Sequence, residues 1–402
     1  MNKPDVIVFS LPRSHESFSS TSLSLAKELS LSTRVFFINN PYTIKDLFLG
    51  RANTSIWSFL RNLVLPNRGP LTFDTDYPNL FISEAGVILP INHLSKGRLY
   101  NYFSRINNFL VNRVVRSVVN EYRLTDFLFI NSFNPLFYYN SVPKGLKMSI
   151  YHCVDDITQS RYIAKHGSYL ELEVLKKYDL VLTTSKKLTR YAATFSKNVK
   201  FLPNAANTDL FKRVLDNAIG THSALDGIHG NVIGYIGNLD HRIDIDLLEF
   251  LVSGRGTDWT FLFVGPVGAE FRQSKLMKSS KVILTGPKPL NELPQYLKVM
   301  KCCIIPFLCN TLTASIYPLK LNEYLAGGKP VVSTNFSEDL VEFSEVISIA
   351  SAKGEFYDMV VRELLEDGPD ARQKRSIFAS TNSWKSRADT FWSIIDNCHS
   401  IK

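Results

Sequence analysis

The residues best suited to chemistry lie in the sequence SIYPLKLNEYLAGGKPVVST, which runs from Ser315 to Thr334. Pro318 suits the first position of a helix, because its missing N–H would have no partner there. The free N–H groups and the dipole of that first turn can hold an anion, and Lys320 adds a positive charge beside them. Glu323 follows on the same helical face, where its carboxylate could bind the diol of a ribose. The segment therefore predicts a site for a diphosphate and a ribose, which together indicate a nucleotide.

The alternative for this segment is a surface ion pair between Lys320 and Glu323 on an ordinary amphipathic helix, a common and weak interaction. The residues that follow favour the nucleotide. Gly327 and Gly328 would end the helix, and the segment Lys329–Ser333 has the pattern of a short buried strand. A helix followed by a buried strand packs against a sheet, so we prefer the nucleotide site.

Two further stretches in the second half could contact such a ligand. Gly237 and Asn238 follow a predicted strand, and a glycine there lets the backbone approach a ligand closely. Arg242 comes shortly afterwards and could pair with a phosphate, although a tight turn with a surface arginine explains the pattern equally well. Gly286 ends another predicted strand, where it could hold the base through backbone groups or form a plain turn.

In the first half, Asp155 and Asp156 follow a predicted strand and precede a helical segment. Two adjacent carboxylates at a strand end can serve as helix cap and general base, one each. We expect Asp156 to be the base and Asp155 to be the cap. The alternative is that both only cap the helix.

These residues need a scaffold that brings strand ends together, and the sequence predicts one. Apolar runs typical of strands buried on both faces alternate with helical patterns along the whole chain. In the first half the predicted strands are Val6–Ser10, Arg34–Ile38, Leu80–Ser83, Phe127–Asn131, Met148–Cys153 and Leu180–Thr184. In the second half they are Val232–Ile236, Phe261–Val264, Val282–Thr285, Cys302–Phe307, Val331–Thr334 and Val346–Ile349. This alternation predicts an α/β fold with two doubly wound parallel sheets, whose ligands sit beyond the carboxyl ends of the strands.

Length and composition fit two soluble globular domains. The chain has 402 residues, of which 45% are apolar and 21% charged. No apolar run approaches the roughly 20 residues that a membrane helix needs. The sequence begins without the layout of a signal peptide, and its five cysteines show neither disulfide nor zinc spacing. These features predict a cytoplasmic protein without a metal site.

The positive charge is concentrated in the first half. The net charge is +9 overall, with 25 Lys and Arg against 14 Asp and Glu in residues 1–200, and 21 against 23 in residues 201–402. This asymmetry predicts an anionic partner for the first half, although no nucleic-acid-binding motif is present. Several basic residues lie in the segment Lys96–Arg123, which fits either a helix on an anionic membrane surface or a core helix with a solvated basic side.

Several of these segments resemble the GT-B glycosyltransferases, especially bacterial enzymes similar to those of teichuronic acid, capsule and exopolysaccharide synthesis. The donor-binding helix of that family is similar to PLKLNEYLAGGKPVVST. Five other stretches match in the same order: YHCVDD, YDLVLTTSKKL, VKFLPNAANTDLF, VIGYIGNLDHRIDIDLL and LTGPKPLNELPQYLKVMKCCIIPF. The chain departs from the commonest retaining pattern of two glutamates eight positions apart, because Ser315 stands at the earlier position.

The resemblance implies two Rossmann-like domains that face each other across a cleft. The first would span residues 1–205, be completed by a C-terminal helix at 380–402, and bind the acceptor. The second, residues 206–379, would bind a nucleotide-diphosphate sugar such as a UDP-sugar.

The resemblance also implies roles for single residues. Pro318, Leu319 and Lys320 would contact the donor, while Arg13 and His15 would lie on the acceptor side. Lys320 and the helix terminus would neutralise the leaving diphosphate, so no metal or other cofactor is expected. The implied activity is transfer of a hexosyl group to a lipid-linked or surface glycan at the inner face of the cytoplasmic membrane.

Two other functions compete with this one. An NAD-dependent oxidoreductase would share the doubly wound sheets, but no G-x-G-x-x-G follows any predicted strand. A nucleotide-sugar-binding protein without catalysis would keep Lys320 and Glu323 and show no turnover with any acceptor.

Overall fold

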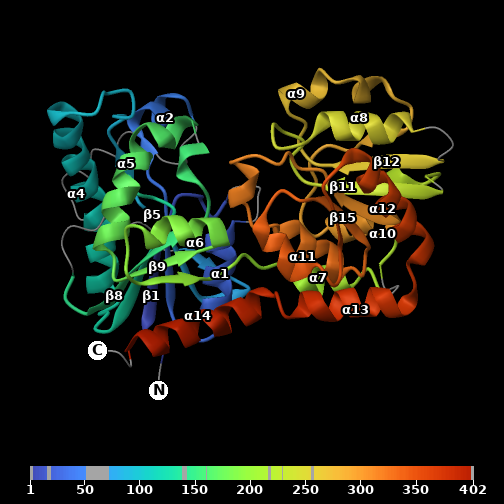
Figure 1. Cartoon of the computed structure of the whole chain (residues 1–402). Helices are drawn as coiled ribbons and strands as arrows, with labels where there is room; N and C mark the ends of the chain where they lie inside the picture. Colours follow the sequence, from blue (N-terminus) through green and yellow to red (C-terminus); the bar gives the residue numbers. More distant parts are fainter. Residues whose placement is uncertain are drawn as a thin grey trace. The chain divides into compact units, whose positions relative to one another are not determined.

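A computed structural model describes residues 3–15, 20–50, 72–137, 143–159, 161–215, 219–228, 230–254 and 258–399. The chain forms two compact units, whose elements are labelled in Figure 1. Unit 1 consists of Met1–Thr184, Leu188–Leu202 and Phe391–Lys402, and unit 2 consists of Ser185–Lys187 and Pro203–Thr390.

The main sheet of unit 1 contains β1 (Asp5–Ser10), β2 (Val35–Asn39), β4 (Thr72–Asp74), β5 (Tyr77–Glu84), β7 (Phe127–Ser132), β8 (Leu146–Cys153), β9 (Leu180–Thr183) and β10 (Val199–Phe201). Their order is β10-β9-β8-β7-β1-β2-β5-β4, and all neighbours are parallel except β4 and β5. A separate parallel pair joins β3 (Tyr42–Thr43) to β6 (Val87–Ile88). The strands that follow β1 in the chain, β2, β4 and β5, lie on one side of it, and the later strand β7 pairs with its other side. The switch point of the sheet therefore lies between β1 and β7.

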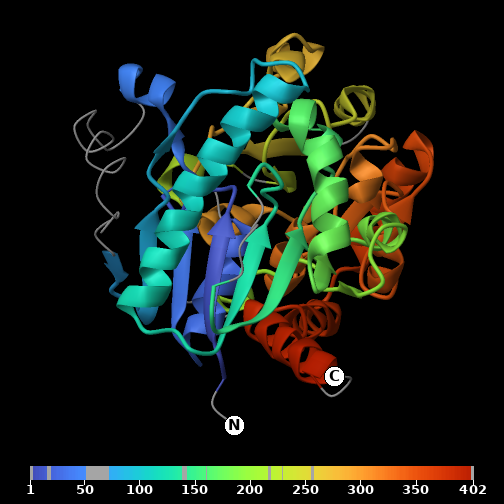
Figure 2. The ribbon, with the colours of Figure 1, turned by 90° about the vertical axis from the view of Figure 1, so that its left-hand side faces the viewer.

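The helices of the first part of the chain are α1 (Thr21–Ser30), α2 (Ile44–Phe48), α4 (Arg98–Glu121), α5 (Arg161–Lys177) and α6 (Lys186–Ala193). Figure 2 shows α4 and α5 lying over the same face of the unit 1 sheet. The core on this face joins alternate residues of the strands, such as Ile7 and Phe129, to Val111 of α4 and Leu175 of α5. Continuous apolar strands form here because helices or loops cover both faces of a parallel sheet.

The sheet of unit 2 contains β11 (Asn231–Ile236), β12 (Trp259–Val264), β13 (Val282–Leu284), β14 (Cys302–Ile305), β15 (Val331–Thr334) and β16 (Ser348–Ala350). Their order is β13-β12-β11-β14-β15-β16, and every pair is parallel. The helices are α7 (Thr208–Lys212), α8 (Ile245–Ser253), α9 (Ala269–Arg272), α10 (Leu293–Val299), α11 (Leu319–Ala326), α12 (Lys353–Glu366), α13 (Pro369–Ser380) and α14 (Trp384–His399). The switch point of this sheet lies between β11 and β14. The prediction of two doubly wound parallel sheets is confirmed.

Helix α14 belongs to both units, because the division falls between Thr390 and Phe391. Phe391, Trp392 and Ile395 are buried, and Lys3 of unit 1 lies with its Nζ 4.8 Å from the centre of the Trp392 ring. The sequence predicted that the chain returns to unit 1 at residue 380. In the structure it returns later, inside α14, at Phe391.

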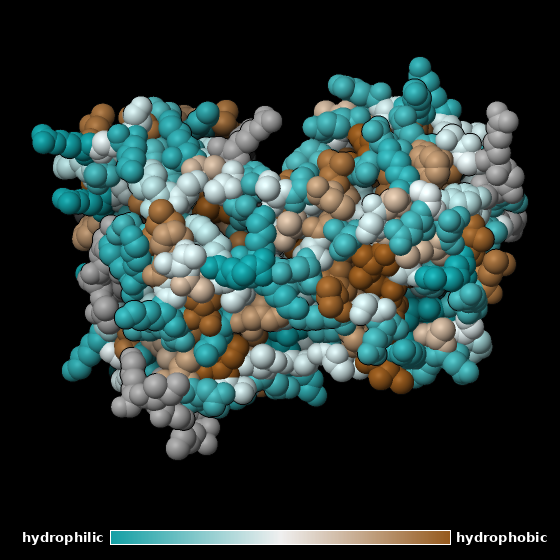
Figure 3. Space-filling view, viewed as in Figure 1, coloured by the Kyte–Doolittle hydropathy of each residue, from teal (hydrophilic) through white to brown (hydrophobic). Residues whose placement is uncertain are grey.

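No helix in the described part of the chain combines the length and apolar character that crossing a membrane requires. On the faces of the units seen in Figure 3, hydrophilic side chains predominate and hydrophobic ones form scattered groups.

Candidate functional site

The candidate site in unit 2 lies at the carboxyl ends of β11 and β12, beside α11. Gly237 and Gly265 end these strands with φ values of +148° and +146°, which side chains rarely adopt. A Cβ atom on Gly265 would lie 2.1 Å from the carbonyl oxygen of Gly237, and one on Gly237 would lie 2.1 Å from Cε of Lys320. Only glycine fits these positions, and the result is a surface of bare backbone next to the lysine.

Lys320 lies close to two aromatic rings. Its Nζ is 5.6 Å from the centre of the Tyr235 ring and 5.9 Å from that of Phe307, within the range of a cation–π interaction. Tyr235 comes from β11 and Phe307 follows β14, so the lysine stands at the switch point of the sheet. This is where ligands of doubly wound sheets bind.

Lys320 and Glu323 are both half-buried, and in the described part of the chain neither side chain has a hydrogen bond or ion pair to another residue. The structure therefore shows no close ion pair between them, although the charge of Glu323 raises the pKa of Lys320 and the charge of Lys320 lowers that of Glu323. Burial, followed by the nearby charge of Arg242, lowers the pKa of Lys320, while burial raises the pKa of Glu323. A bound anion would relieve the first effect, and hydroxyl donors would relieve the second.

Arg242 is held by Asp240, which the sequence analysis missed. The Arg242 Nε donates to Oδ1 of Asp240 at 2.8 Å and its Nη2 donates to Oδ2 at 2.6 Å. Although burial opposes ionisation of Asp240, these hydrogen bonds and the charge of Arg242 lower its pKa. The guanidinium carbon lies 5.9 Å from the centre of the Phe307 ring, the same ring that Lys320 approaches. Two cations thus border one aromatic side chain at the strand ends.

The start of α11 differs by one residue from the prediction. Pro318 is the N-cap and Leu319 is the first helical residue. The N–H of Leu319 donates to Tyr317 O at 2.9 Å and that of Leu321 donates to Pro318 O at 3.0 Å, so part of the first turn already has partners. The hydroxyl of Tyr324 accepts from the N–H of Ile236 at 2.8 Å and fixes the helix to the end of β11. An anion bound here would therefore be held more by Lys320 than by the helix terminus.

Asn238 and Gly286, which were also predicted to contact the donor, make hydrogen bonds through their backbone carbonyl groups. The carbonyl of Asn238 accepts from the Tyr235 hydroxyl at 3.2 Å, and that of Gly286 accepts from the N–H of Gly265 at 3.0 Å. Gly286 has a φ of +70°, and a Cβ atom added to it would meet no other atom within 4 Å. Ser315, at the position of the missing glutamate, is buried and donates its hydroxyl to Leu312 O at 2.6 Å. That serine has a structural role.

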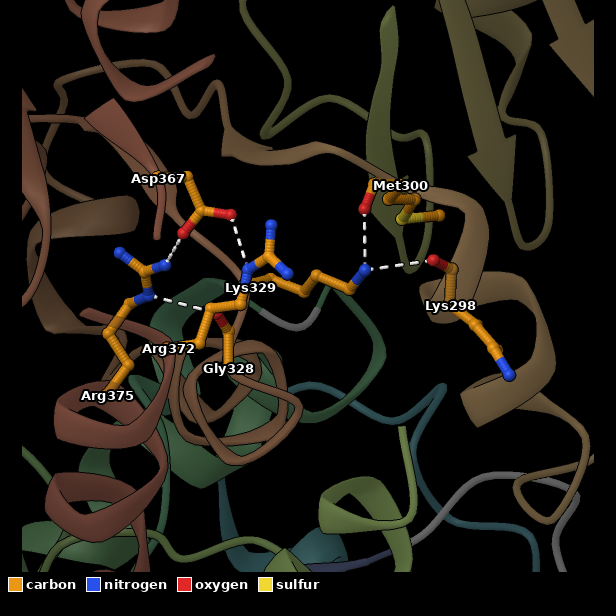
Figure 4. A network of polar contacts seen from close by, with 7 residues as sticks. All are labelled: Lys298, Met300, Gly328, Lys329, Asp367, Arg372 and Arg375. Atoms are coloured by element: carbon orange, nitrogen blue, oxygen red, sulfur yellow. Dashed lines mark hydrogen bonds and ion pairs between the residues drawn. The ribbon is translucent and has the colours of Figure 1, made fainter. Parts of the chain in front are cut away.

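The second lysine of the motif, Lys329, is also structural (Figure 4). Its Nζ donates to the carbonyl oxygens of Lys298 at 2.9 Å and Met300 at 2.7 Å, which end α10. Burial lowers its pKa to about 8. Lys329 thus fixes the entry of β15 to the end of α10, whereas Lys320 points to the strand ends.

A second set of contacts in Figure 4 holds the turn between α11 and β15. Arg375 donates from Nε to Gly328 O at 3.0 Å and forms an ion pair with Asp367. Arg372 donates to the same carboxylate at 2.7 Å. The turn that ends α11 is thereby tied to α13, which fixes the helix carrying Lys320 and Glu323.

In unit 1, the adjacent aspartates lie at the end of β8, but their roles differ from the prediction. Oδ1 of Asp156 accepts from the N–H and the hydroxyl of Thr158, at 3.0 and 2.6 Å, and so caps the 3-10 turn Ile157–Gln159. Asp155 accepts from the N–H of Asp156 at 2.8 Å. The expectation that Asp155 is the cap of this turn is wrong, because the turn geometry brings Asp156 to Thr158.

Arg13 and His15 hold a loop of unit 1. Arg13 donates to the carbonyl oxygens of Asn40 at 3.0 Å and Pro41 at 2.9 Å, and its guanidinium lies 3.9 Å from the centre of the Tyr42 ring. Nε2 of His15 is 3.1 Å from the Tyr42 hydroxyl. Residues 16–19 of the serine-rich loop lie outside the described residues. The acceptor role of Arg13 and His15 stays a prediction.

Two buried polar side chains near the end of β8 were not predicted. Nδ1 of His152 is 3.3 Å from Oγ of Ser132, and its Nε2 has no hydrogen-bond partner among the described residues. Burial lowers the pKa of His152 to about 4, so the ring is neutral. Glu171 accepts from the hydroxyls of Tyr151 at 2.7 Å and Tyr191 at 3.2 Å, and burial raises its pKa to about 7. The motif YHCVDD contains His152, but nothing in it indicates an unpaired ring nitrogen.

Within the described part of the chain, His, Cys, Asp and Glu form no group of three or more that could hold a metal ion.

Comparisons with known proteins place these features in context. Residues 230–366 match the family of glycosyl transferases group 1. A Bacillus subtilis (strain 168) protein described as a teichuronic acid biosynthesis glycosyltransferase, TuaH, is 30% identical over 171 residues, which are 41% of this chain and 42% of that protein. The match therefore spans less than half of that relative's length.

Solved structures with the same fold cover the whole chain. Sucrose-phosphate synthase from Thermosynechococcus elongatus has a TM-score of 0.67 at 14% identity, over 100% of both chains. Trehalose 6-phosphate synthase from Burkholderia multivorans has a TM-score of 0.67 at 10% identity, again over 100% of both. Anabaena HepE, solved in complex with UDP and glucose, has a TM-score of 0.63 at 13% identity, over 97% of this chain and 99% of that one.

Proposed function

We propose that this chain, which has the GT-B fold and matches the group 1 glycosyl transferases over residues 230–366, is a glycosyltransferase that uses a nucleotide-diphosphate sugar. The observation that carries the proposal is the pair Lys320 and Glu323. Both are half-buried on one face of α11, beside bare backbone at a switch point, and neither side chain has a hydrogen bond or ion pair among the described residues. A diphosphate and a ribose diol supply the anion and the hydroxyl donors that these side chains lack.

In this reaction the developing negative charge falls on the leaving diphosphate. Lys320 and Arg242 stabilise that charge through their own positive charges, which a half-buried setting makes more effective than water would. Gly237 lets the diphosphate approach the backbone, and Glu323 holds the ribose. Because the protein supplies cations, we propose that the reaction needs no metal.

The donor and the acceptor are finer points of the proposal. HepE was solved with UDP and glucose, which supports a UDP-hexose donor. TuaH is described as an enzyme of teichuronic acid biosynthesis, which supports a surface glycan or its lipid-linked precursor as acceptor. Such a precursor would be used at the inner face of the cytoplasmic membrane, with Asp156, or else Asp155, as the base that activates the acceptor hydroxyl.

A panel of nucleotide sugars and nicotinamide dinucleotides tests the proposed class by thermal shift. A ligand present at about 100 times its dissociation constant stabilises a protein by about 2.7 kcal/mol, which gives a clear rise in melting temperature. We expect nucleotide-diphosphate sugars and their free nucleotide diphosphates to stabilise the protein. Stabilisation by NAD alone would favour the oxidoreductase, and stabilisation without sugar transfer to any acceptor would favour a binding protein.

Glu323→Ala should abolish discrimination between ribose and 2′-deoxyribose nucleotides. In the parent protein the carboxylate accepts from the ribose hydroxyls, and hydrogen bonds to a charged group contribute about 1.5–3 kcal/mol. We therefore expect the parent, titrated by calorimetry, to bind UDP about 10- to 150-fold more tightly than 2′-deoxy-UDP. The variant should bind the two nucleotides equally.

Glu270→Ala is a matched control, because Glu270 is an exposed carboxylate of the same unit. It should keep the preference of the parent. A parent protein that binds both nucleotides equally would remove the ribose role from Glu323.

A further inference from the structure

Helix α4 carries apolar residues on two faces. The inner face packs Val111 and Val118 into the core of unit 1. The outer face exposes Leu99, Tyr102 and Phe109, which keep 58%, 62% and 58% of their surface accessible. A helix that only covered a sheet would carry polar residues there. The outer apolar residues therefore need another explanation.

These three residues form one stripe together with arginines. Positions 99, 102 and 109 are separated by three and seven residues, so they lie on one side of the helix. Four arginines flank or continue this side, and we call the whole set the outer stripe of α4: Leu99, Tyr102, Phe109, Arg98, Arg105, Arg113 and Arg116. The single acidic residue of the helix, Glu121, stands at its last position. The outer stripe is thus apolar and strongly basic at once.

The outer side of α4 is not covered by the described elements of unit 1. Figure 2 shows α4 crossing the front of this unit, and no described element of the unit lies over its outer side. The guanidinium carbon of Arg113 is 5.9 Å from the centre of the Phe109 ring, so charge and aromatic surface are presented together.

We propose that the outer stripe of α4 binds the surface of a bilayer that contains anionic lipid. Leu99, Tyr102 and Phe109 can enter the region between head groups and acyl chains, while the exposed Arg98 and Arg105 pair with lipid phosphates. The helix has 24 residues, which makes it about 36 Å long. A symmetric dimer through the same stripe would bring arginines against arginines, which disfavours a second copy of the chain as the partner.

This inference rests on the proposed function in one respect, because a membrane-bound acceptor gives the surface its use. The outer stripe itself contains none of the donor-binding residues. Loss of membrane binding and loss of nucleotide binding can therefore be measured separately.

Co-sedimentation of the full chain with vesicles tests the proposal. The probes are vesicles of phosphatidylcholine alone and of phosphatidylcholine with about one third phosphatidylglycerol. We expect binding to the anionic vesicles only, and weaker binding as salt rises, because screening shortens to about 8 Å at physiological ionic strength. The triple variant Leu99→Ser/Tyr102→Ser/Phe109→Ser and the double variant Arg98→Gln/Arg105→Gln should each lose about tenfold or more in affinity.

Matched controls remove the same kinds of residue elsewhere. Val341→Ser/Leu365→Ser/Ile377→Ser removes three exposed apolar residues of unit 2, and Arg213→Gln/Lys278→Gln removes two exposed charges. Both controls should bind vesicles like the parent, and all variants should keep the circular dichroism and nucleotide affinity of the parent.

The proposal is overturned if the parent ignores anionic vesicles, or if the stripe variants bind them as well as the controls do. It is also overturned if the triple variant turns a dimer into a monomer in ultracentrifugation without changing vesicle binding. Failure of the parent to bind any nucleotide would instead refute the proposed function and leave the vesicle result in place.

Discussion

Asp156→Asn should slow sugar transfer by about 10²- to 10⁴-fold while leaving donor affinity unchanged, because general base catalysis typically contributes that much. An inverting transfer needs a group that removes the proton of the attacking hydroxyl. Asparagine cannot remove it. Turnover with a saturating donor and the donor dissociation constant, measured on the same preparation, check the two halves of this expectation.

The structure indicates that Asp156→Asn removes the carboxylate without removing the hydrogen bonds that cap the turn. The cap of the Ile157–Gln159 turn uses Oδ1 of Asp156 as an acceptor, and an asparagine keeps an acceptor oxygen at that position. The parallel variant Asp155→Asn removes the neighbouring charge and should have a much smaller effect. A product that retains the anomeric configuration, formed at nearly normal rate by Asp156→Asn, would show that the enzyme uses no such base.

Lys320→Ala is expected to weaken nucleotide-diphosphate binding by about 10- to 150-fold, which corresponds to the roughly 1.5–3 kcal/mol of a charge-assisted contact. The fold should survive, because the lysine is half-buried and its side chain has no hydrogen bond or ion pair among the described residues. Calorimetry with UDP on the folded variant measures the loss. Lys301→Ala removes an exposed charge of the same unit and should bind like the parent.

Lys329→Ala provides a contrast, because it removes the part-buried hydrogen bonds to Lys298 O and Met300 O that join β15 to α10. It should lower the melting temperature and leave the affinity of the folded protein unchanged. Unchanged UDP affinity in a folded Lys320→Ala protein would contradict the assignment of Lys320.

The same contact predicts a dependence on pH. A diphosphate binds the protonated lysine better, so binding raises the pKa of Lys320 and affinity falls as pH rises through its pKa in the free protein. Burial and Arg242 lower that pKa, and the fall should begin below the pH of about 10.4 at which an ordinary lysine titrates. Lys320→Ala should lack this part of the pH profile.

The strands of the fold were predictable where burial on both faces imposes an uninterrupted apolar run. Phe261–Val264 and Val331–Thr334 are examples, and both lie within the sheet of unit 2. The edge strands β4 and β10 were missed, because an edge strand has a neighbour on one side only and needs no such run. The start of α11 was displaced by one residue, since a proline satisfies both the N-cap and the first helical position.

The candidate site shows the same limit. Lys320 and Glu323 were found because three residues along a helix fix their common face. Asp240 was missed, because a pair two residues apart meets only if the turn between them is tight, as it is here. Asp155 and Asp156 are adjacent, and the backbone angles decide which of them accepts a hydrogen bond from Thr158. The sequence does not determine these angles.

The division of α14 has a consequence for the order in which the chain can fold during synthesis. All of unit 2 up to Thr390 leaves the ribosome before the segment that supplies Phe391, Trp392 and Ile395 to unit 1. Unit 1 is begun first yet can be completed only last, because the contacts of these three side chains with it form only after unit 2 has been made. A nascent chain is thus able to form the sheet of unit 2, and α11 beside it, before its first unit is finished.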